Sequence, residues 1–147
     1  MKRFLIGAGM TLLLNICAAA SMPSNDSGTL LRHQRSDCSL VVKHSTVLNR
    51  EKDIQTLAKA RQELRSVLEK MQQDASRLST DDRLRAHKDY LLSIEEGLSQ
   101  LNQLAEEPMT PANLEQVKNM CAFITVVDQQ LLESLAVQPR KNYRVSR

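Results

Sequence analysis

Aromatic side chains are nearly absent from this sequence of 147 residues, which contains no tryptophan, two tyrosines and two phenylalanines. Proteins that bind single-stranded nucleic acid stack bases on aromatic rings, and most small-molecule pockets are lined by such rings. The formal net charge is only +3, so the chain also lacks the broad basic surface that neutralises phosphates. The sequence therefore predicts that nucleic acid is not a partner.

Patterns typical of catalysis and metal binding are also lacking. Beyond residue 20 the only glycines are Gly28 and Gly97, too few for a phosphate-cradling loop, and no Gly-x-Ser-x-Gly elbow occurs. The histidines, His33, His44 and His87, do not have the spacing of metal ligands, and no Cys-x-x-Cys is present. We therefore expect neither an enzyme nor a bound cofactor or metal ion.

The first twenty residues have the pattern of a secretory signal peptide. Lys2 and Arg3 precede an apolar run over 4–16, and Ala18 and Ala20 occupy the small-residue positions before a cleavage site. The run is too short to cross a bilayer, which takes about 20 helical residues. We expect cleavage after Ala20 and a periplasmic or secreted protein.

Two alternatives exist for this segment. Cys17 could be the lipid-modified first residue of a bacterial lipoprotein, but the bulky Ile16 stands where such signals need a small residue. The segment could also stay attached as an uncleaved anchor. The cleaved signal peptide is the interpretation that the small residues favour.

After cleavage the chain divides into three parts. Residues 21–36 are polar and turn-rich and predict a flexible lead-in, and residues 37–138 predict a helical bundle domain. Residues 139–147 predict a basic, disordered tail, the one part that could contact an anionic membrane or an acidic partner. About 127 residues are enough for one compact domain, not two.

Apolar residues recur at alternating steps of three and four in three segments, 54–78, 84–105 and 114–135, which predicts helices packed along one face. The seams comprise Ile54, Leu57, Leu64, Leu68, Met71, Ala75 and Leu78; Leu84, Leu91, Ile94, Leu98, Leu101 and Ala105; and Leu114, Val117, Cys121, Ile124, Leu131 and Leu135, interrupted by Arg61, His87 and Asp128. The connections are short, so neighbouring helices should be antiparallel. The predicted fold is all-α, an antiparallel bundle of three long helices with a short N-terminal packing segment.

Capping residues support these bounds. The segment 79–82 offers N-caps and first-turn acids before the second helix, and 106–108 ends that helix at a proline. Thr110 is placed as an N-cap, with Pro111 at the first helical position.

The third predicted helix is apolar on nearly every side between Met120 and Val127. Phe123 and Val126 fall away from its seam, and a helix that is apolar all round is normally covered all round. We expect the segment 38–42 to fold back over this face. The alternatives are a short strand pair between the two apolar stretches, or a docking face for another protein or a second copy of the chain.

Polar and sulfur-containing residues add two specific expectations. Without Cys17 the chain keeps Cys38 and Cys121, and an even count in an oxidising compartment favours a disulfide, although two buried thiols are the alternative. Gly97 should lie level with the expected disulfide along the bundle. It could allow a neighbouring helix to approach closely. His87 and Asp128 fall about one layer apart, so they could form a buried polar pair, or each could reach solvent.

These features together predict a non-catalytic, exported helical protein that binds another protein in the bacterial envelope, in an accessory, pilotin-like or chaperone-like role. That hypothesis rests on class and not on residues shared with a family. A secreted effector or inhibitor of a host or competitor protein is the second hypothesis. A carrier of a small ligand or lipid is the third, and it would need a cavity between the helices.

Overall fold

The computed structural model describes the backbone of residues 26–145 and the side chains of residues 27–137. This part of the chain forms four long helices, α2 (Asp26–Arg50), α3 (Ile54–Leu78), α4 (Lys88–Glu106) and α5 (Pro111–Val145), with a short 3₁₀-helix, η1 (Asp82–His87), before α4. No strand occurs between residues 26 and 145, so the strand pairing considered for the apolar stretches is not formed. The predicted signal peptide lies outside the described residues.

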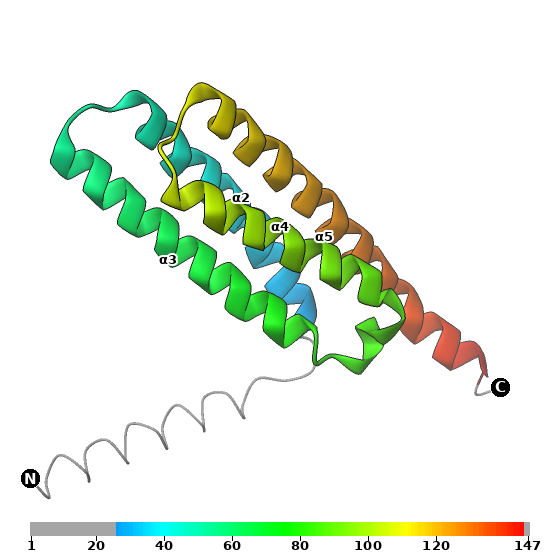
Figure 1. Cartoon of the computed structure of the whole chain (residues 1–147). Coiled ribbons are helices and arrows are strands. Elements are labelled where there is room, and N and C mark those ends of the chain that lie inside the picture. Colours follow the sequence, from blue (N-terminus) through cyan, green and yellow to red (C-terminus); the bar gives the residue numbers. More distant parts are fainter. Residues whose placement is uncertain (1–25, 146–147) are drawn as a thin grey trace, which may run out of the picture.

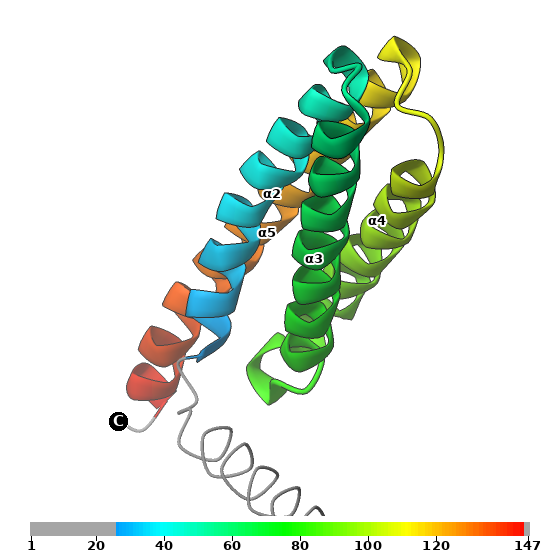
Figure 2. The same ribbon diagram turned by 90° about the vertical axis from the view of Figure 1, so that its left-hand side faces the viewer.

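The helices form an antiparallel four-helix bundle (Figure 1). Each helix packs on the next one in sequence, and α2 also packs along α5, which closes the bundle. Figure 2 shows α5 behind α2, with α3 next to α2 and α4 beside α3. The first and last described helices are therefore direct neighbours, although they lie far apart in the sequence.

The all-α class predicted from the sequence is confirmed, but the number of helices differs. Three of the four helices match the predicted segments, and α3 begins and ends at the expected residues. The predicted short packing segment is instead part of α2, a helix of 25 residues. This helix also takes in residues 26–36, where the sequence predicted a flexible lead-in.

The inward face of α2 explains why its helical pattern is hard to recognise. Its buried seam steps by three and four like the others, but it alternates apolar with polar residues. The seam comprises Ser27, Leu31, Gln34, Cys38, Val41, Ser45 and Leu48. Because Ser27, Gln34 and Ser45 occupy core positions, the segment reads as polar although the spacing is helical.

The core is aliphatic. Its most deeply buried apolar side chains are supplied by all four long helices and η1, with the largest being Leu31, Leu64, Leu68, Met71, Leu78, Leu84, Ile94, Leu98, Leu101, Ile124 and Leu131. Burying each such side chain stabilises the fold by about 1.5–3 kcal/mol relative to leaving it exposed. The two aromatic residues with described side chains, Tyr90 and Phe123, both lie at the surface.

The helix ends carry the caps that the sequence predicted. Thr110 Oγ1 accepts a hydrogen bond from the amide of Asn113 at 3.1 Å, and α5 starts with Pro111. Asp81, within the predicted capping segment, accepts from the amide of Arg83 at 2.8 Å and begins η1. The Ser27 hydroxyl donates to the Asp81 carboxylate, so the start of α2 is held against the connection between α3 and α4.

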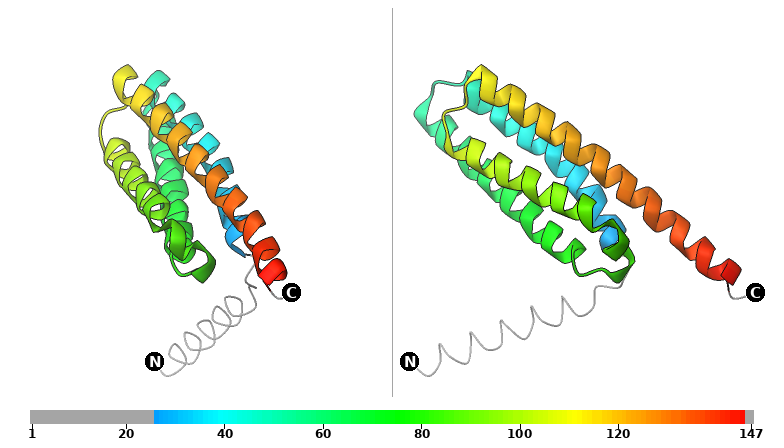
Figure 3. Two further views of the ribbon diagram at one scale, coloured as in Figure 1. Left: turned by 90° about the vertical axis from the view of Figure 1, so that its right-hand side faces the viewer. Right: turned by 45° about the vertical axis from the view of Figure 1, so that its right-hand side comes forward.

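The last helix is longer than expected. The backbone of α5 continues to Val145, through most of the segment 139–147 that was predicted as a disordered tail. Figure 3 shows this end of α5 extending beyond the other three helices.

Gly97 marks a close approach between α4 and α5, as the sequence suggested. A Cβ atom there would lie 3.0 Å from Met120 Sδ and 3.2 Å from Ile124 Cδ1. Alanine normally stabilises a helix interior by about 1 kcal/mol relative to glycine. In Gly97→Ala we expect the new Cβ to crowd Met120 and Ile124, which cancels the gain in helix propensity. The free energy of unfolding should fall by up to about 1 kcal/mol.

Gly28→Ala is the matched control for this substitution. A Cβ at Gly28 would meet only Arg32 Nη1, at 3.7 Å, so this variant should be as stable as the wild type or up to about 1 kcal/mol more stable. Urea denaturation followed by circular dichroism measures both. An equal gain in the two variants would show that α4 and α5 do not crowd at Gly97.

Candidate functional site

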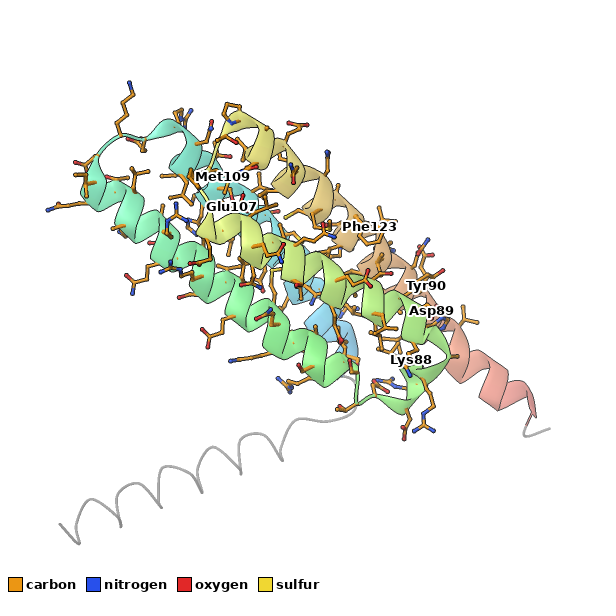
Figure 4. All side chains as sticks on the ribbon, viewed as in Figure 1. Lys88, Asp89, Tyr90, Glu107, Met109 and Phe123 are labelled. Atoms are coloured by element: carbon orange, nitrogen blue, oxygen red, sulfur yellow. The ribbon has the colours of Figure 1, made fainter. Side chains whose placement is uncertain are left out.

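The outer surface of α5 carries exposed apolar side chains. Phe123 is 46% exposed and Val126 is 57% exposed, and the half-buried Met120 lies beside them. Figure 4 shows Phe123 projecting from the middle of α5. We call Phe123, Val126 and Met120 the α5 apolar patch. Val127, which the sequence grouped with these residues, is instead buried in the core at 4% exposure.

The expectation that the segment 38–42 covers this patch is wrong for Phe123 and Val126. Helix α2 packs against α5 on the side of Cys121, where Val41 is only 1% exposed. Leu40, from the same predicted cover, points outward and is 39% exposed. Successive helical residues are about 100° apart, so one neighbouring helix cannot bury both faces of α5.

The stretch Pro111–Val137 of α5 is long and apolar enough to cross a membrane by length and composition, and its most apolar window has a mean hydropathy of 1.3. In the bundle, 33% of its most apolar window is buried. Its inward side chains, such as Ile124 and Leu131, belong to the common core, which accounts for part of the high hydropathy. The α5 apolar patch accounts for another part of this high hydropathy.

Cys38 and Cys121 meet across the interface of α2 and α5. Both are buried, at 3% and 4% exposure, and both are free thiols. The structure therefore brings the predicted pair of cysteines together, but without the predicted disulfide. The Cys38 thiol donates to Cys121 sulfur, which lowers the pKa of Cys121, and the same interaction together with burial raises the pKa of Cys38.

An open groove lies over this thiol pair. It has a volume of about 710 Å³ and is lined by Arg32, Arg35, Ser36, Cys38, Ser39 and Val42 from α2 and by Lys118, Cys121, Ala122 and Thr125 from α5. Three of these side chains are cationic and none is acidic. Arg35 donates to Gln129 Oε1 at 2.7 Å, whereas Arg32 and Lys118 make no ion pair within the described part of the chain. We call this feature the thiol groove.

Asp128 is the most deeply buried acid in the described chain, at 0% exposure. Neither carboxylate oxygen has a hydrogen-bond partner among the described residues. The pKa of Asp128 is raised to about 8, mainly by burial and also by the nearby Cys38, while Arg35 opposes the rise. The carboxyl group is therefore mostly protonated at neutral pH.

The structure does not bring His87 and Asp128 together as the predicted polar pair. His87 is half-buried at the end of η1 and stacks on Tyr90, with ring centroids 5.9 Å apart. No ion pair with Asp128 is present among residues 27–137. The 3₁₀ geometry of η1 has about three residues per turn, so it shifts the phase of the seam before α4 begins.

No protein-family model matches this chain, and no curated protein and no solved structure shows a match to it. The candidate sites must therefore be interpreted from their own chemistry. Within the described residues, no three His, Cys, Asp or Glu side chains are grouped so that they could hold a metal ion.

A buried acidic cluster between α2 and α3 was not found from the sequence. Asp37 and Asp74 are 5% and 6% exposed, and Lys70 Nζ lies 3.5 Å from Asp37 Oδ2. Burial raises the pKa of Asp74, Lys70 lowers it and Asp37 raises it further. Asp37 and Asp74 each lie one residue before a seam position, Cys38 and Ala75, so the seam patterns gave no signal for this cluster.

Proposed function

We propose that this chain is an exported, non-catalytic helical protein of the bacterial envelope that binds another protein through the α5 apolar patch. The observation that carries the proposal is the exposure of Phe123 and Val126, at 46% and 57%, on a helix whose inward apolar side chains, such as Ile124 and Leu131, are buried in the core. Export is supported by the pattern of the first twenty residues. The role follows the accessory, pilotin-like or chaperone-like class predicted from the sequence.

The size of the patch suits a modest contact and not a large permanent interface. Fully burying a phenylalanine or valine side chain is worth about 1.5–3 kcal/mol, and these two are already half covered. A large aromatic side chain next to small apolar ones is a common centre for an interface. A partner would therefore need further contacts around Phe123, and a second copy of this chain is one candidate partner.

Site-specific photocrosslinking in cells tests the proposal. A photoreactive amino acid at position 123 should form one adduct of defined mass, because the side chain would lie inside the contact. Val126→Asp in the same chain should reduce that adduct about tenfold or more, since it places a charge in a desolvated apolar contact. The adduct is quantified by immunoblotting and identified by mass spectrometry.

Leu92 on α4 provides the matched control. It is 47% exposed, like Phe123, but lies on the side of α4 that faces the connection to α3. The photoreactive residue at position 92 should give no corresponding adduct. Equal crosslinking from positions 92 and 123, or no effect of Val126→Asp, would show that the patch is not the binding surface.

Location separates this proposal from the second hypothesis, a secreted effector or inhibitor. The envelope role requires the processed chain to remain with the periplasmic or membrane fractions. Abundant release of the processed chain into the medium would favour the effector. An unprocessed chain in the cytoplasm would contradict both.

We further propose that the two cysteines form a disulfide once the protein is in an oxidising compartment. The proposal is supported by the contact between the thiols of Cys38 and Cys121, on the first and last described helices. On the chain-entropy model, a bridge that closes such a long loop stabilises a protein by about 4 kcal/mol, less any strain in the folded state.

A further inference from the structure

We propose that the thiol groove is a reaction site for a small anionic disulfide, which it attracts through Arg32 and Lys118 and which exchanges with the Cys38–Cys121 pair. Glutathione disulfide is the natural probe for this chemistry, because it is small and negatively charged at neutral pH. The inference deepens the proposed oxidation of the cysteines, since it names the reactant and the residues that select it. It does not depend on the α5 apolar patch.

The geometry places the reacting sulfurs and the selecting charges in one feature. Cys38 and Cys121 both line the thiol groove, so a molecule seated there lies next to both cysteine residues. The groove volume of about 710 Å³ falls in the range of pockets that hold small molecules, about 300–1,000 Å³. The thiols are 3% and 4% exposed, which would exclude a bulky protein oxidant more strongly than a flexible small molecule.

The charges around the groove favour an anion. Arg32, Arg35 and Lys118 line it, and no acidic side chain does. Arg35 donates to the neutral Gln129 and keeps its charge, so all three cations attract an anion; Arg32 and Lys118 are the two without such a bond among the described residues and are the pair changed in the test below. A cleft lined by one sign of charge raises the local concentration of the opposite ion by about tenfold or more at low salt.

The contact between the sulfurs assigns their roles. Cys38 donates its proton toward Cys121, which lowers the pKa of Cys121 and raises that of Cys38. The thiolate is the attacking form of a cysteine. Both sulfurs lie beside the thiol groove; we take Cys121 as the first nucleophile and Cys38 as the thiol that resolves the mixed disulfide, and the trapping experiment below tests this order.

The exchange balances without any further reactant. The Cys121 thiolate attacks one sulfur of glutathione disulfide, so that a bond forms from Cys121 to glutathione and one glutathione leaves as a thiolate. Cys38, as its thiolate, then attacks Cys121 sulfur and displaces the second glutathione. The two thiol protons of the protein pass to the two released glutathiones. The protein pair is oxidised by two electrons and glutathione disulfide is reduced by two.

Reaction with disulfides of opposite charge tests the selection. The reduced, full-length processed protein is mixed with glutathione disulfide or with the cationic disulfide cystamine, and thiol loss is followed at low salt. We expect the ratio of the glutathione rate to the cystamine rate to fall about tenfold or more in Arg32→Glu/Lys118→Glu. Comparing this ratio between protein variants cancels the intrinsic difference between the two reagents.

Lys59→Glu/Lys88→Glu is the matched control. Both lysines are exposed and lie outside the thiol groove, and the double variant changes the net charge by the same amount. Its rate ratio should remain close to that of the wild type. Equal changes in the two double variants, or no change in either, would overturn the proposal, because the selection would then come from overall charge or would not exist.

The roles of the two thiols are tested by trapping. Cys38→Ser should react and accumulate a single glutathione adduct on Cys121, detected by intact and peptide mass spectrometry. Cys121→Ser should react at least about tenfold more slowly. The opposite order would overturn the assignment, and unreactive thiols in the folded wild-type protein would overturn the site. The crosslinking experiment at position 123 does not depend on the thiols. The proposal for the α5 apolar patch and the proposal for the thiol groove can therefore fail separately.

Discussion

Asp128→Asn is expected to abolish most of the loss of stability that the wild-type protein shows as the pH rises from about 5 to about 8. The pKa of Asp128 is raised by burial from 3.8 to about 8 in the folded protein. Between these values the folded state keeps the proton that the unfolded state releases, so the free energy of unfolding falls as the pH rises. Each pKa unit corresponds to about 1.4 kcal/mol, so the loss over this interval should be on the order of 3 kcal/mol.

Urea denaturation at several pH values measures this effect. Asparagine has almost the same shape as a protonated aspartate and carries no charge at any of these pH values. The variant should therefore resemble the wild type near pH 5 and be the more stable protein near pH 8. A small slope of the same sign should remain, because burial also raises the pKa of Asp74. A slope as steep in Asp128→Asn as in the wild type would show that another group carries the pH dependence.

Leu31→Ala should destabilise the protein by about 2–5 kcal/mol, the range found when buried leucines are truncated. Leu31 is 0% exposed and lies in the first half of α2, within the segment 21–36 that the sequence predicted as a lead-in. If this segment is an integral part of the bundle, the truncation leaves a cavity beside α5 and α3. A flexible segment would tolerate the same change.

Leu40→Ala controls for the loss of leucine from the same helix. Leu40 is 39% exposed, and its truncation should cost about 1 kcal/mol or less. The change in intrinsic helix propensity is the same at the two positions, so the difference between the variants reports burial. The midpoint and slope of each urea unfolding curve give the free energy of unfolding of each variant. Similar, small losses at positions 31 and 40 would contradict the packing of α2.

The sequence predicts α3, α4 and α5 because their buried seams are filled almost entirely by aliphatic residues. Helix α3 begins at Ile54 because Asp53 is its N-cap and accepts a hydrogen bond from the Thr56 amide at 2.9 Å, and it ends at Leu78 before a polar connection; Ile54 itself is 81% exposed. The same spacing exists in α2, but Gln34 and Ser45 occupy buried positions there. The polar composition of this segment therefore suggested a loop. Only the packing against the neighbouring helices shows that Gln34 and Ser45 face the core.

The candidate sites were predictable to different degrees. The even cysteine count and the expected fold-back of the segment 38–42 paired Cys38 with Cys121, and in the structure both are buried, free thiols where α2 packs on α5. The exposure of Phe123 could not be predicted, because an apolar face looks the same whether a neighbouring helix or a partner covers it. His87 was placed on the seam by assuming α-helical steps, which the 3₁₀ turn of η1 breaks. Two of the cations of the thiol groove, Arg32 and Arg35, lie on α2, which the sequence did not predict as a long helix.

The pairing of α2 with α5 imposes an order of assembly. As the chain emerges, the buried side of α2 has no surface to join along α5 until nearly the whole polypeptide has appeared, and such long-range closure is slow. Helix α2 also packs along α3, so these two helices can pair before α5 is available. The closed bundle, in contrast, requires the whole chain through α5.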